Sequence, residues 1–553
     1  MKSRLKSILV ISLGVLSTVP GLAQFSGDKV PFDMPEVKVP VFKTDTFNVK
    51  DYGAENDGIT LNTKAFAKAI DACSAAGGGV VLIPEGCWLT GPIVLKSNVN
   101  LHTTRGTLVK FSRNFDDYPI VQAAYEGIMM MRCASPVSGK NLQNVAITGY
   151  GIFEGSGDAW RSVKREKLTP GDWKSLITSG GILSEDKNTW YPSKKYLKGN
   201  AYPSGYLGPN ATIKDYEAIK DFLRPVMVSF IQCNSVLLDG PTFQNSPSWC
   251  IHPLLCENLT LRNVTVRNPQ YAQNGDGIDV ESCRIGTITN CSFDAGDDGI
   301  CIKSGKNAEG RKRGKPTEYF VISNNVVFHG HGGFVIGSEM SGGVRNIFVH
   351  NCCFVGTDIG LRFKSTRGRG GVVENIYVSG IAMINIPTTA ILFDMFYGGA
   401  SPIPEGGAKV ENNSETITKP VVDEGTPRFE NFFIKDISCN GADQAILVKG
   451  LPEMSIRNIS LENISIKSKR GFSCINGDHV KLTHIKLDIE NGDAGIIKDS
   501  KNVDLSGFSC NHCPGKLLRV SGAESENISI SGNNINKNDI EMGREVKSKV
   551  NIH

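Results

Sequence analysis

Several features that would mark other classes of protein are scarce in this 553-residue chain. The net charge is only +4 and the basic residues are dispersed, which argues against a nucleic-acid partner but suits an anionic substrate. Beyond the N-terminal segment no stretch is apolar enough to cross a bilayer, so we expect no stable membrane insertion. Hydrophobic residues nevertheless make up 40% of the chain, enough for a large core.

The 15 Cys residues lack the spacing of a zinc site. The Cys-x-x-Cys motif from Cys510 to Cys513 has no second ligand pair at a suitable distance, so we expect no metal and no other cofactor. Most of the other Cys lie in strand-like segments, where they are expected to be small buried side chains. A local disulfide between Cys510 and Cys513 stays open, because export would permit one.

The first 23 residues have the pattern of a secretory signal peptide. Three basic residues precede an apolar run at 8–19, and the small residues Gly21 and Ala23 follow. The run is shorter than the ~20 residues that a membrane span needs. We therefore expect cleavage after Ala23 and export, either to a periplasm or out of the cell.

An internal repeat of the form Asn-apolar-x-apolar dominates the sequence. Its copies recur, for example, 29 residues apart from Asn346 to Asn375 and 27 apart from Asn431 to Asn458. This interval is too short for a propeller blade, and no helical pattern between the copies suggests leucine-rich or ankyrin repeats. Strands that stack on their equivalents one turn later form a solenoid, in which Asn accepts left-handed turns and forms side-chain ladders. The repeat predicts an all-β fold, a parallel β-helix.

The expected catalytic domain covers residues 47–553 and follows a Pro-rich N-terminal segment at 24–46. One short helix, with Asn62 as its predicted N-cap, would cover the first open sheet edge. A loop insertion at about 161–224 interrupts the repeat and is rich in Lys and aromatic residues. Those aromatic rings could stack on sugars or simply pack the insertion onto the β-helix. The apolar face of the helix would consist of Phe66, Ala69, Ile70 and Cys73.

Four short motifs contain the residues that are candidates for catalysis or substrate binding. They are Asn-Gly-Asp-Gly-Ile-Asp at 274–279, Gly-Asp-Asp-Gly at 296–299, Gly-His-Gly at 330–332 and Arg-Phe-Lys at 362–364. Asp297 lies 21 residues after Asp276, which is close to one coil, and His331 and Arg362 follow at steps of 34 and 31 residues. Neighbouring coils lie about 4.8 Å apart, so the spacing predicts one shared face for all four motifs.

Asp276, Asp297 and Asp298 suit acid–base chemistry. Adjacent strand residues point to opposite faces, so Asp297 and Asp298 can share a site only if the backbone departs from the pleat, for which Gly296 and Gly299 would give freedom. Three gathered carboxylates repel each other, which raises the pKa of at least one of them. The result is an acid beside a base, the pair that glycoside hydrolysis requires.

Arg362 and Lys364 are two residues apart on one strand and therefore face the same side. Both can bind one anionic group, such as a uronate carboxylate, which favours a pectic substrate. Each motif alone could have a purely structural role, since Asp-Asp between glycines is usually a turn and Arg-x-Lys on a strand is usually solvated surface. Their order and coil-like spacing favour a shared site. Tyr397, about one coil beyond Lys364, either contacts the sugar or packs a loop.

Together the four motifs resemble those of glycoside hydrolase family 28, the polygalacturonases and their relatives, over most of the chain from Phe47 onward. The resemblance implies a right-handed, single-stranded parallel β-helix that hydrolyses α-1,4-galacturonosidic bonds of polygalacturonan with inversion and without a metal. It makes Asp297 the general acid. Asp276 and Asp298 would hold and deprotonate the attacking water.

The same resemblance implies roles for the surrounding residues. His331 would tune the protonation of Asp297, Arg362 with Lys364 would bind the galacturonate carboxylate at the cleavage point, and Asn274 would give a positioning hydrogen bond. Gly275 departs from the family, in which many members have Thr. Relatives that cut rhamnogalacturonan tend to lack the His and the Asn present here, and the long insertion is similar to that of members acting from chain ends. We therefore expect an exo-acting polygalacturonase.

Other interpretations stay open at this point. A rhamnogalacturonan or xylogalacturonan hydrolase of the same family would share the motifs. A pectate lyase would share the β-helix but eliminate with calcium, and a non-catalytic glycan-binding β-helix would keep its function without Asp297. In each catalytic case the expected partner is a pectic polysaccharide or oligogalacturonide, bound by a monomer.

Overall fold

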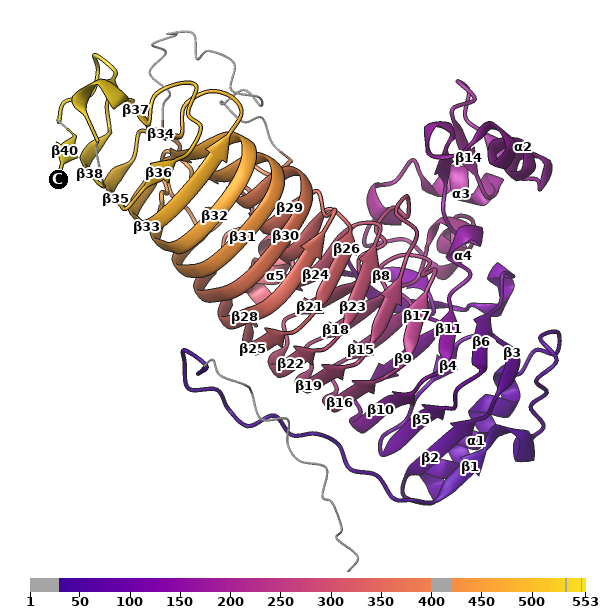
Figure 1. Cartoon of the computed structure of the whole chain (residues 1–553). Helices are drawn as coiled ribbons and strands as arrows, with labels where there is room; N and C mark the ends of the chain where they lie inside the picture. The colour runs from indigo at the N-terminus through magenta and orange to yellow at the C-terminus, as the bar shows by residue number, and fades with distance from the viewer. Residues whose placement is uncertain (1–28, 399–418, 533–534, 549) are drawn as a thin grey trace, which may run out of the picture.

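The computed structural model describes residues 29–398, 419–532, 535–548 and 550–553, so the expected signal peptide lies outside the described residues. The described chain winds into one elongated stack of coils (Figure 1). Strands of successive coils pair in parallel and in register, and these pairings connect 35 strands. The right-handed parallel β-helix predicted from the sequence is confirmed.

One parallel sheet runs the length of the β-helix and contains the Asn repeats at its strand starts. From β28 to β33 its strands are longer, because consecutive strands of a coil merge into one. Its members are β1 (Thr46–Asn48), β2 (Gly79–Ile83), β5 (Val99–Thr103), β10 (Gln143–Gly149), β16 (Asn234–Asp239), β19 (Glu257–Arg262), β22 (Arg284–Thr289), β25 (Thr317–Ser323), β28 (Val344–Val355), β30 (Val372–Asp394), β31 (Arg428–Lys449), β32 (Ile456–Ile475), β33 (Gly477–Ile489), β35 (Lys501–Ser506), β38 (Glu526–Ser531) and β40 (Asn551–Ile552).

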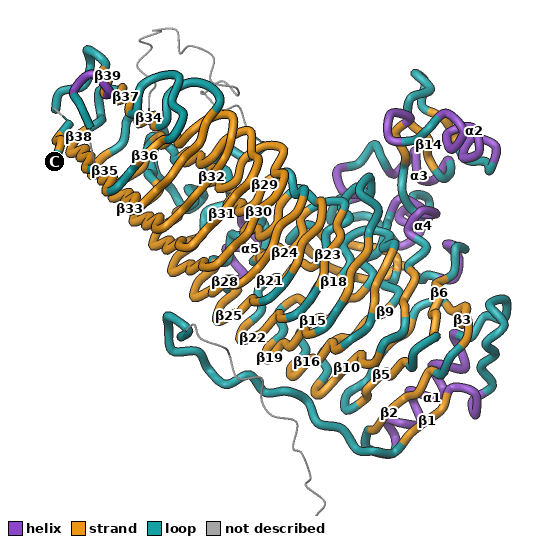
Figure 2. Tube along the Cα trace, in the orientation of Figure 1, coloured by secondary structure: helices purple, strands orange, loops and turns teal. Residues whose placement is uncertain are grey.

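A second column of parallel strands follows the first along each coil (Figure 2). It joins the merged strands at β28, and β36 continues the pairing on β33. Its members are β3 (Gly86–Thr90), β6 (Thr107–Phe111), β11 (Ile152–Glu154), β17 (Thr242–Gln244), β20 (Thr265–Arg267), β23 (Ser292–Ala295), β26 (Val326–His329) and β36 (Ser509–Cys510).

The third column, named here the site sheet, carries the predicted chemistry. It merges into the C-terminal parts of β30, β31 and β32 and then continues as separate strands. Its members are β4 (Ile93–Val94), β9 (Val137–Lys140), β15 (Val228–Ile231), β18 (Ile251–Leu254), β21 (Ile278–Glu281), β24 (Asp298–Lys303), β27 (Gly332–Ile336), β29 (Ile359–Lys364), β34 (Gly495–Lys498), β37 (Leu518–Ser521) and β39 (Ile540–Met542).

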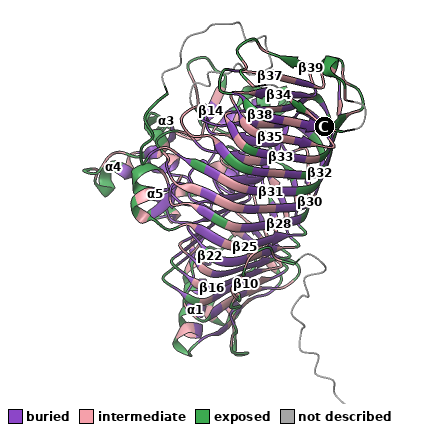
Figure 3. Ribbon diagram, turned by 90° about the vertical axis from the view of Figure 1, so that its left-hand side faces the viewer, coloured by how far each residue is buried: buried purple, intermediate pink, exposed green. Residues whose placement is uncertain are grey.

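Stacked apolar side chains fill the inside of the coils. One continuous cluster of buried Ile, Val, Leu and Phe runs from the first strand to the last coils, and Figure 3 shows the buried residues along the strands. At the strand starts, Asn458 donates to the side chain of Asn431 (3.0 Å), which donates to that of Asn375 (3.2 Å). All three residues have positive φ, so the expected Asn ladder in left-handed turns is confirmed.

The helix α1 (Thr63–Ala75) covers the first coil, as predicted, with Phe66, Ala69, Ile70 and Cys73 buried. Asn62 is its N-cap residue, but its side chain does not cap the helix. Instead, Asn62 accepts from the backbone N–H of Glu55 and donates to the carbonyl of Leu89, which fixes the turn before the helix. The N-terminal segment before β1 runs along the outside of the coils (Figure 1). There the backbone N–H of Lys38 donates to the side chain of Asn258.

In the described residues, two excursions with strands of their own leave the coils, although the sequence indicated only one. The unpredicted one is an antiparallel hairpin of β7 (Ile120–Tyr125) and β8 (Ile128–Cys133). Period-two alternation is the same in a hairpin as in a coil strand, so the pattern did not distinguish them.

The predicted insertion projects from the N-terminal half of the β-helix (Figure 1). It contains a small antiparallel sheet of β12 (Val163–Lys164), β14 (Thr189–Tyr191) and β13 (Ile182–Leu183), with α2 (Pro170–Thr178), α3 (Lys194–Gly199) and α4 (Ile213–Glu217). Four of its aromatic residues are buried and pack the insertion, namely Trp173, Trp190, Tyr196 and Tyr216. Trp160, directly before the insertion, is buried as well.

The remaining helix, α5 (Asn307–Arg313), follows β24. Short 3-10 turns lie at Val49–Tyr52, Phe115–Asp117, Gly157–Ala159, Arg165–Lys167, Pro203–Gly205, Lys220–Phe222 and Lys537–Asp539. All fifteen Cys residues are free thiols in the structure, and most of them are buried as expected.

Two neighbouring residues of β31 test the coil packing. Phe432 is fully buried against Phe363 and Phe393, whereas Phe433 is 41% exposed and stacks on Tyr377. We expect Phe432→Ala to lower the free energy of unfolding by about 3–5 kcal/mol, because it leaves a cavity. Phe433→Ala should cost about 1 kcal/mol or less. Equal losses for the two variants in denaturant-induced unfolding would contradict this packing.

Candidate active site

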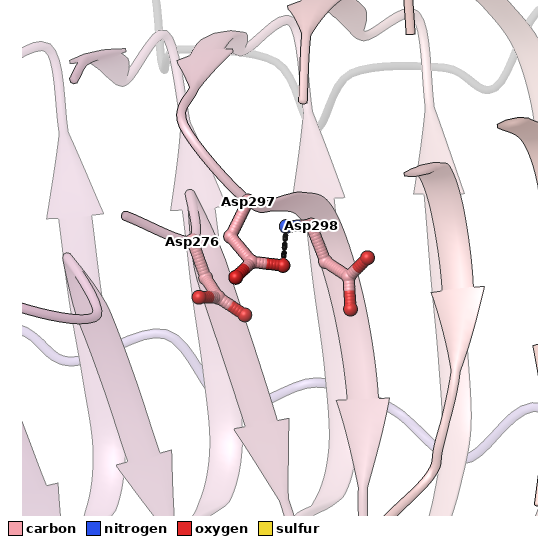
Figure 4. Close-up of side chains that lie close together, drawn as sticks. All are labelled: Asp276, Asp297 and Asp298. Atoms are coloured by element: carbon pink, nitrogen blue, oxygen red, sulfur yellow. Dashed lines mark hydrogen bonds between the residues drawn. The ribbon is translucent and has the colours of Figure 1, made fainter. Parts of the chain in front are cut away.

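The pairing register of the site sheet brings the predicted acidic residues together. Ile278 of β21 pairs with Ile300 of β24, so Asp276 lies beside Asp298 on the next coil. The backbone N–H of Gly277 donates to the carbonyl of Asp298 (2.9 Å), which fixes this alignment. One carboxylate oxygen from each of Asp276, Asp297 and Asp298 lies within 4.8 Å of the others. Figure 4 shows the three side chains next to one another, with the carboxylates of Asp276 and Asp297 close together.

Asp297 joins this group because the backbone turns sharply before β24. Its Oδ1 accepts the backbone N–H of Asp298 (3.0 Å), and its carbonyl accepts the N–H of His331 (2.8 Å). The flanking glycines act through space rather than through positive φ. A Cβ at Gly296 would lie 2.5 Å from the carbonyl oxygen of Ala272, and one at Gly299 would lie 2.4 Å from Val327. The expected departure from the pleat is confirmed, but the reason for these glycines is close packing.

Asp298 is held by two cations. Lys364 Nζ lies 2.7 Å from its Oδ2, and Arg362 Nη1 lies 3.2 Å from its Oδ1. Both cations come from β29 and face the same side, as their spacing predicted, and the ring of Tyr397 lies 4.9 Å from Lys364 Nζ. Within the described ranges, the carboxylate of Asp298 is the one acidic group that forms ion pairs with Arg362 and Lys364.

His331 lies at the exposed rim beside Asp297. Its Nδ1 is 3.1 Å from Asp297 Oδ1, and its Nε2 is 3.8 Å from Asp358 Oδ2. The hydrogen bond to Asp297 is the main cause that raises the pKa of His331. A protonated imidazole can therefore persist beside Asp297 to a higher pH than in free His.

The environments of the two buried carboxyls push their proton affinities in opposite directions. Burial and the nearby charges of Asp279 and Asp297 raise the pKa of Asp276 well above its usual value. Burial would also raise the pKa of Asp298, but the positive charges of Lys364 and Arg362 outweigh it and lower the pKa below its usual range. The site thus combines a carboxylate fixed in its charged form with a carboxyl that holds its proton more strongly.

Asn274 precedes the group in a left-handed turn with φ 53°. Its Oδ1 accepts from Arg224 Nη2 (2.9 Å), and Arg224 Nη1 also donates to the carbonyl of Gln273 (2.9 Å). Arg224 ends the insertion, so this contact ties the insertion to the site. A Cβ at Gly275 would lie 2.8 Å from that of Ala272, so the side chain of Ala272 occupies the space that Thr would need.

Sequence reasoning missed a second layer of charges behind the acidic group. Asp279, Lys303 and Glu339 are buried, and Lys303 forms ion pairs with both acids. Asp279 is the last residue of the 274–279 motif and lies within β21, and Lys303 is the last residue of β24. Charged side chains in strands are usually exposed, so the sequence alone did not indicate that these two are buried. Asp358 was also missed, because no motif surrounds it.

The convergence of three carboxylates also resembles a cation site in its geometry. Both oxygens of Asp298 are already engaged by Arg362 and Lys364. These two positive charges would repel a divalent ion, so the residues do not fit a metal site well.

Comparison with known proteins agrees with this geometry. The family model "Glycosyl hydrolases family 28" matches residues 210–419, and a model described as "Rhamnogalacturonase A/epimerase, pectate lyase-like" matches residues 46–125. The exo-poly-alpha-D-galacturonosidase of Dickeya chrysanthemi is 28% identical over 73% of this chain, and the alignment spans 64% of that relative. A probable polygalacturonase of Vitis vinifera is 26% identical over 75% of this chain and 73% of its own length.

Solved structures give the same result. The hyperthermoactive exopolygalacturonase of Thermotoga maritima is 31% identical, with a TM-score of 0.62, and the match covers 78% of this chain and 89% of that one. The family 28 exopolygalacturonase of Yersinia enterocolitica, 21% identical with a TM-score of 0.58, shares the fold. The chain belongs to glycosyl hydrolase family 28 and is a glycoside hydrolase. The roles of the individual site residues stay predictions.

The opposite pKa shifts give opposite expectations for stability. The raised pKa of Asp276 means that its contribution is greatest at low pH and is lost as pH rises above about 4. Asp276→Asn should therefore raise the thermal unfolding midpoint near pH 7 but not near about pH 4.

Asp298→Asn provides the matched comparison. The stability from its lowered pKa is present above about pH 4 and is lost at lower pH. Removing its charge strands Lys364 and Arg362, so we expect a loss of about 3–5 kcal/mol near neutral pH. The same direction of change for both variants at neutral pH would show that the charges are not arranged as described.

Proposed function

We propose that the protein hydrolyses α-1,4-galacturonosidic bonds of polygalacturonan and acts from chain ends. The observation that carries the proposal is the group of three converging carboxylates beside two cations, in a member of family 28. The relatives from Dickeya chrysanthemi and Thermotoga maritima, described as exo-acting on polygalacturonan, support this substrate and mode of action.

In this reaction Asp297 acts as the general acid. It is the most exposed of the three acids, and its contact with His331 provides a nearby source for a replacement proton. Asp297 protonates the glycosidic oxygen as the bond from that oxygen to the anomeric carbon breaks. A water oxygen bonds to the anomeric carbon, Asp276 accepts its proton, and Asp298 orients it.

The engagement of Asp298 favours attack by water over attack by a carboxylate. Both of its oxygens bind cations, and Asp276 is buried, so neither is free to bond to the sugar. The oxygens lie within 4.8 Å, closer than the roughly 6.5–9.5 Å usual for inverting glycosidases. We therefore expect inversion because neither Asp276 nor Asp298 can bond to the sugar, and not because of the distance between the carboxylates.

The position of the insertion supports action from chain ends. Arg224 and Ser162 attach it to Asn274 and Gln273, and Arg132 of the hairpin donates to the carbonyl of Arg224 (3.1 Å). The insertion thus stands on the N-terminal side of the acids, whereas β29 and its two cations lie on the other side, two coils beyond β24. The tip of the hairpin reaches past β24, where the backbone N–H of Lys306 donates to the carbonyl of Gly127 (3.3 Å). A polymer crossing the acids would meet the insertion on their N-terminal side.

Export is a further part of the proposal and rests on the pattern of residues 1–23. No helix in the described part of the chain is long and apolar enough to span a membrane. Sequencing the mature N-terminus tests export, since cleavage after Ala23 would leave Gln24 first.

Replacing the proposed acid tests the reaction directly. We expect Asp297→Asn to lower kcat on polygalacturonate by about 10²–10⁴-fold with little change in KM, because the variant keeps the shape but cannot donate the proton. Release of reducing ends measures this effect. Full activity in the variant would exclude Asp297 as the acid. If the wild type acts only on rhamnogalacturonan, the protein is instead a rhamnogalacturonan hydrolase of the same family.

The mode of action is tested by following viscosity and reducing ends together. An enzyme acting from chain ends should release short products while the viscosity of polygalacturonate stays high. An endo-acting polygalacturonase, compared at equal release of reducing ends, serves as the control. A collapse of viscosity before short products accumulate would contradict end-directed action.

A further inference from the structure

A buried lysine lies behind the acidic group and is not used in the proposed reaction. Lys303 is the last residue of β24 and is only 4% exposed. Its Nζ lies 3.4 Å from Asp279 Oδ1, 3.2 Å from Glu339 Oε2 and 4.2 Å from the ring centre of Trp249. A fully buried ammonium group is costly to desolvate, so its retention between two acids calls for a reason.

Asp279 explains why a counter-charge is needed at this position. It follows Asp276 by three residues, is completely buried, and neither of its oxygens has a hydrogen-bond partner in the part of the chain that the structure describes. Among the described residues, Lys303 supplies the only ion pair of Asp279. Without that cation, two buried carboxyls would lie three residues apart, Asp276 just before β21 and Asp279 within it. The ionisation of either would then oppose that of the other.

Other charged groups surround this pair from each packed element. On the neighbouring strand β18, His252 lies opposite Asp279, but its Nε2 contacts Glu281 (2.9 Å). From the loop after β27, Glu339 binds Lys303 and also Arg369 (3.4 Å). The other main electrostatic influences on Lys303, Asp279 and Glu339 come from the charged groups Asp298, Asp276, Lys364 and Lys306 and from the buried thiol of Cys301.

We propose that Lys303 is a positioning residue of the hydrolytic reaction, whose buried ammonium group supplies the counter-charge that lets Asp276, beside Asp279, accept a proton from water. This inference rests on the proposed function. Asp276 must lose its proton before it can act as a base, and burial together with three neighbouring carboxylates opposes that loss. Lys303 is the one positive charge among the main influences on Asp276, and it lowers the pKa of that carboxyl.

Glu339 adjusts the strength of this effect. Its carboxylate competes with Asp279 for Lys303, while Arg369 partly neutralises it. Burial would raise the pKa of Glu339, but Lys303 and Arg369 reverse this and lower it to about 2, so Glu339 stays charged across the working range. Removal of Lys303 and removal of the Glu339 charge should therefore change the ionisation of Asp276 in opposite directions.

The test is the pH dependence of kcat/KM on polygalacturonate, whose acid limb reports the base in the free enzyme. Lys303→Met should move the midpoint of that limb upward by about one pH unit or more, with activity recovering toward neutral pH. Glu339→Gln should move it downward, because Lys303 is then left with Asp279 as its carboxylate partner. A lysine that only holds the loop in place would lower activity at every pH without moving the limb.

Lys449→Met is the matched control. Lys449 is a buried lysine of the same sheet, paired with Asp394 (3.4 Å) farther along the stack, and we expect it to leave the acid limb unmoved. The inference fails if the wild type is active but neither Lys303→Met nor Glu339→Gln shifts the midpoint of the acid limb. It also fails if the two variants shift that midpoint in the same direction. If Lys303→Met does not fold, the direction of the Glu339→Gln shift decides. An inactive wild-type enzyme would instead reject the proposed function.

Discussion

The parallel register between β21, β24, β27 and β29 is the constraint on which the active site depends. Ile278 pairs with Ile300, Ile300 with Phe334, and Phe334 with Leu361, and each of these side chains is buried in the core. Because a shift by one residue would exchange the inner and outer faces, this core packing also fixes the residues that face outward. Asp276, Asp298 and the two cations of β29 are thereby held on neighbouring coils.

Within that frame the protein separates the roles of similar groups by their surroundings. Asp298 is buried against two cations and stays charged, Asp276 is buried against other acids and binds its proton more strongly, and Asp297 lies nearer the surface beside His331. Lys303 then limits the effect of burial on Asp276. Three aspartates can thus serve as an acid, a base and an orienting group without a change in residue type.

The repeat made much of this arrangement predictable. A coil-length interval placed the four motifs on one face, and the i, i+2 spacing placed Arg362 and Lys364 on one side. The sequence did not indicate that Gly296 and Gly299 are required for packing, since this depends on Ala272 and Val327, which lie elsewhere in the chain. The partnership of Lys303 with Glu339 was hidden for the same reason, because 36 residues separate them and only the fold brings them together.

The most direct test of water-mediated hydrolysis is the configuration of the first product, followed by NMR as an α-linked oligogalacturonide is cleaved. If Asp276 and Asp298 hold a water while Asp297 protonates the leaving group, the β-anomer must appear first and then convert slowly to the mixture. Initial release of the α-anomer would mean that a carboxylate bonds to the sugar, and would contradict the assignment of roles to these three residues.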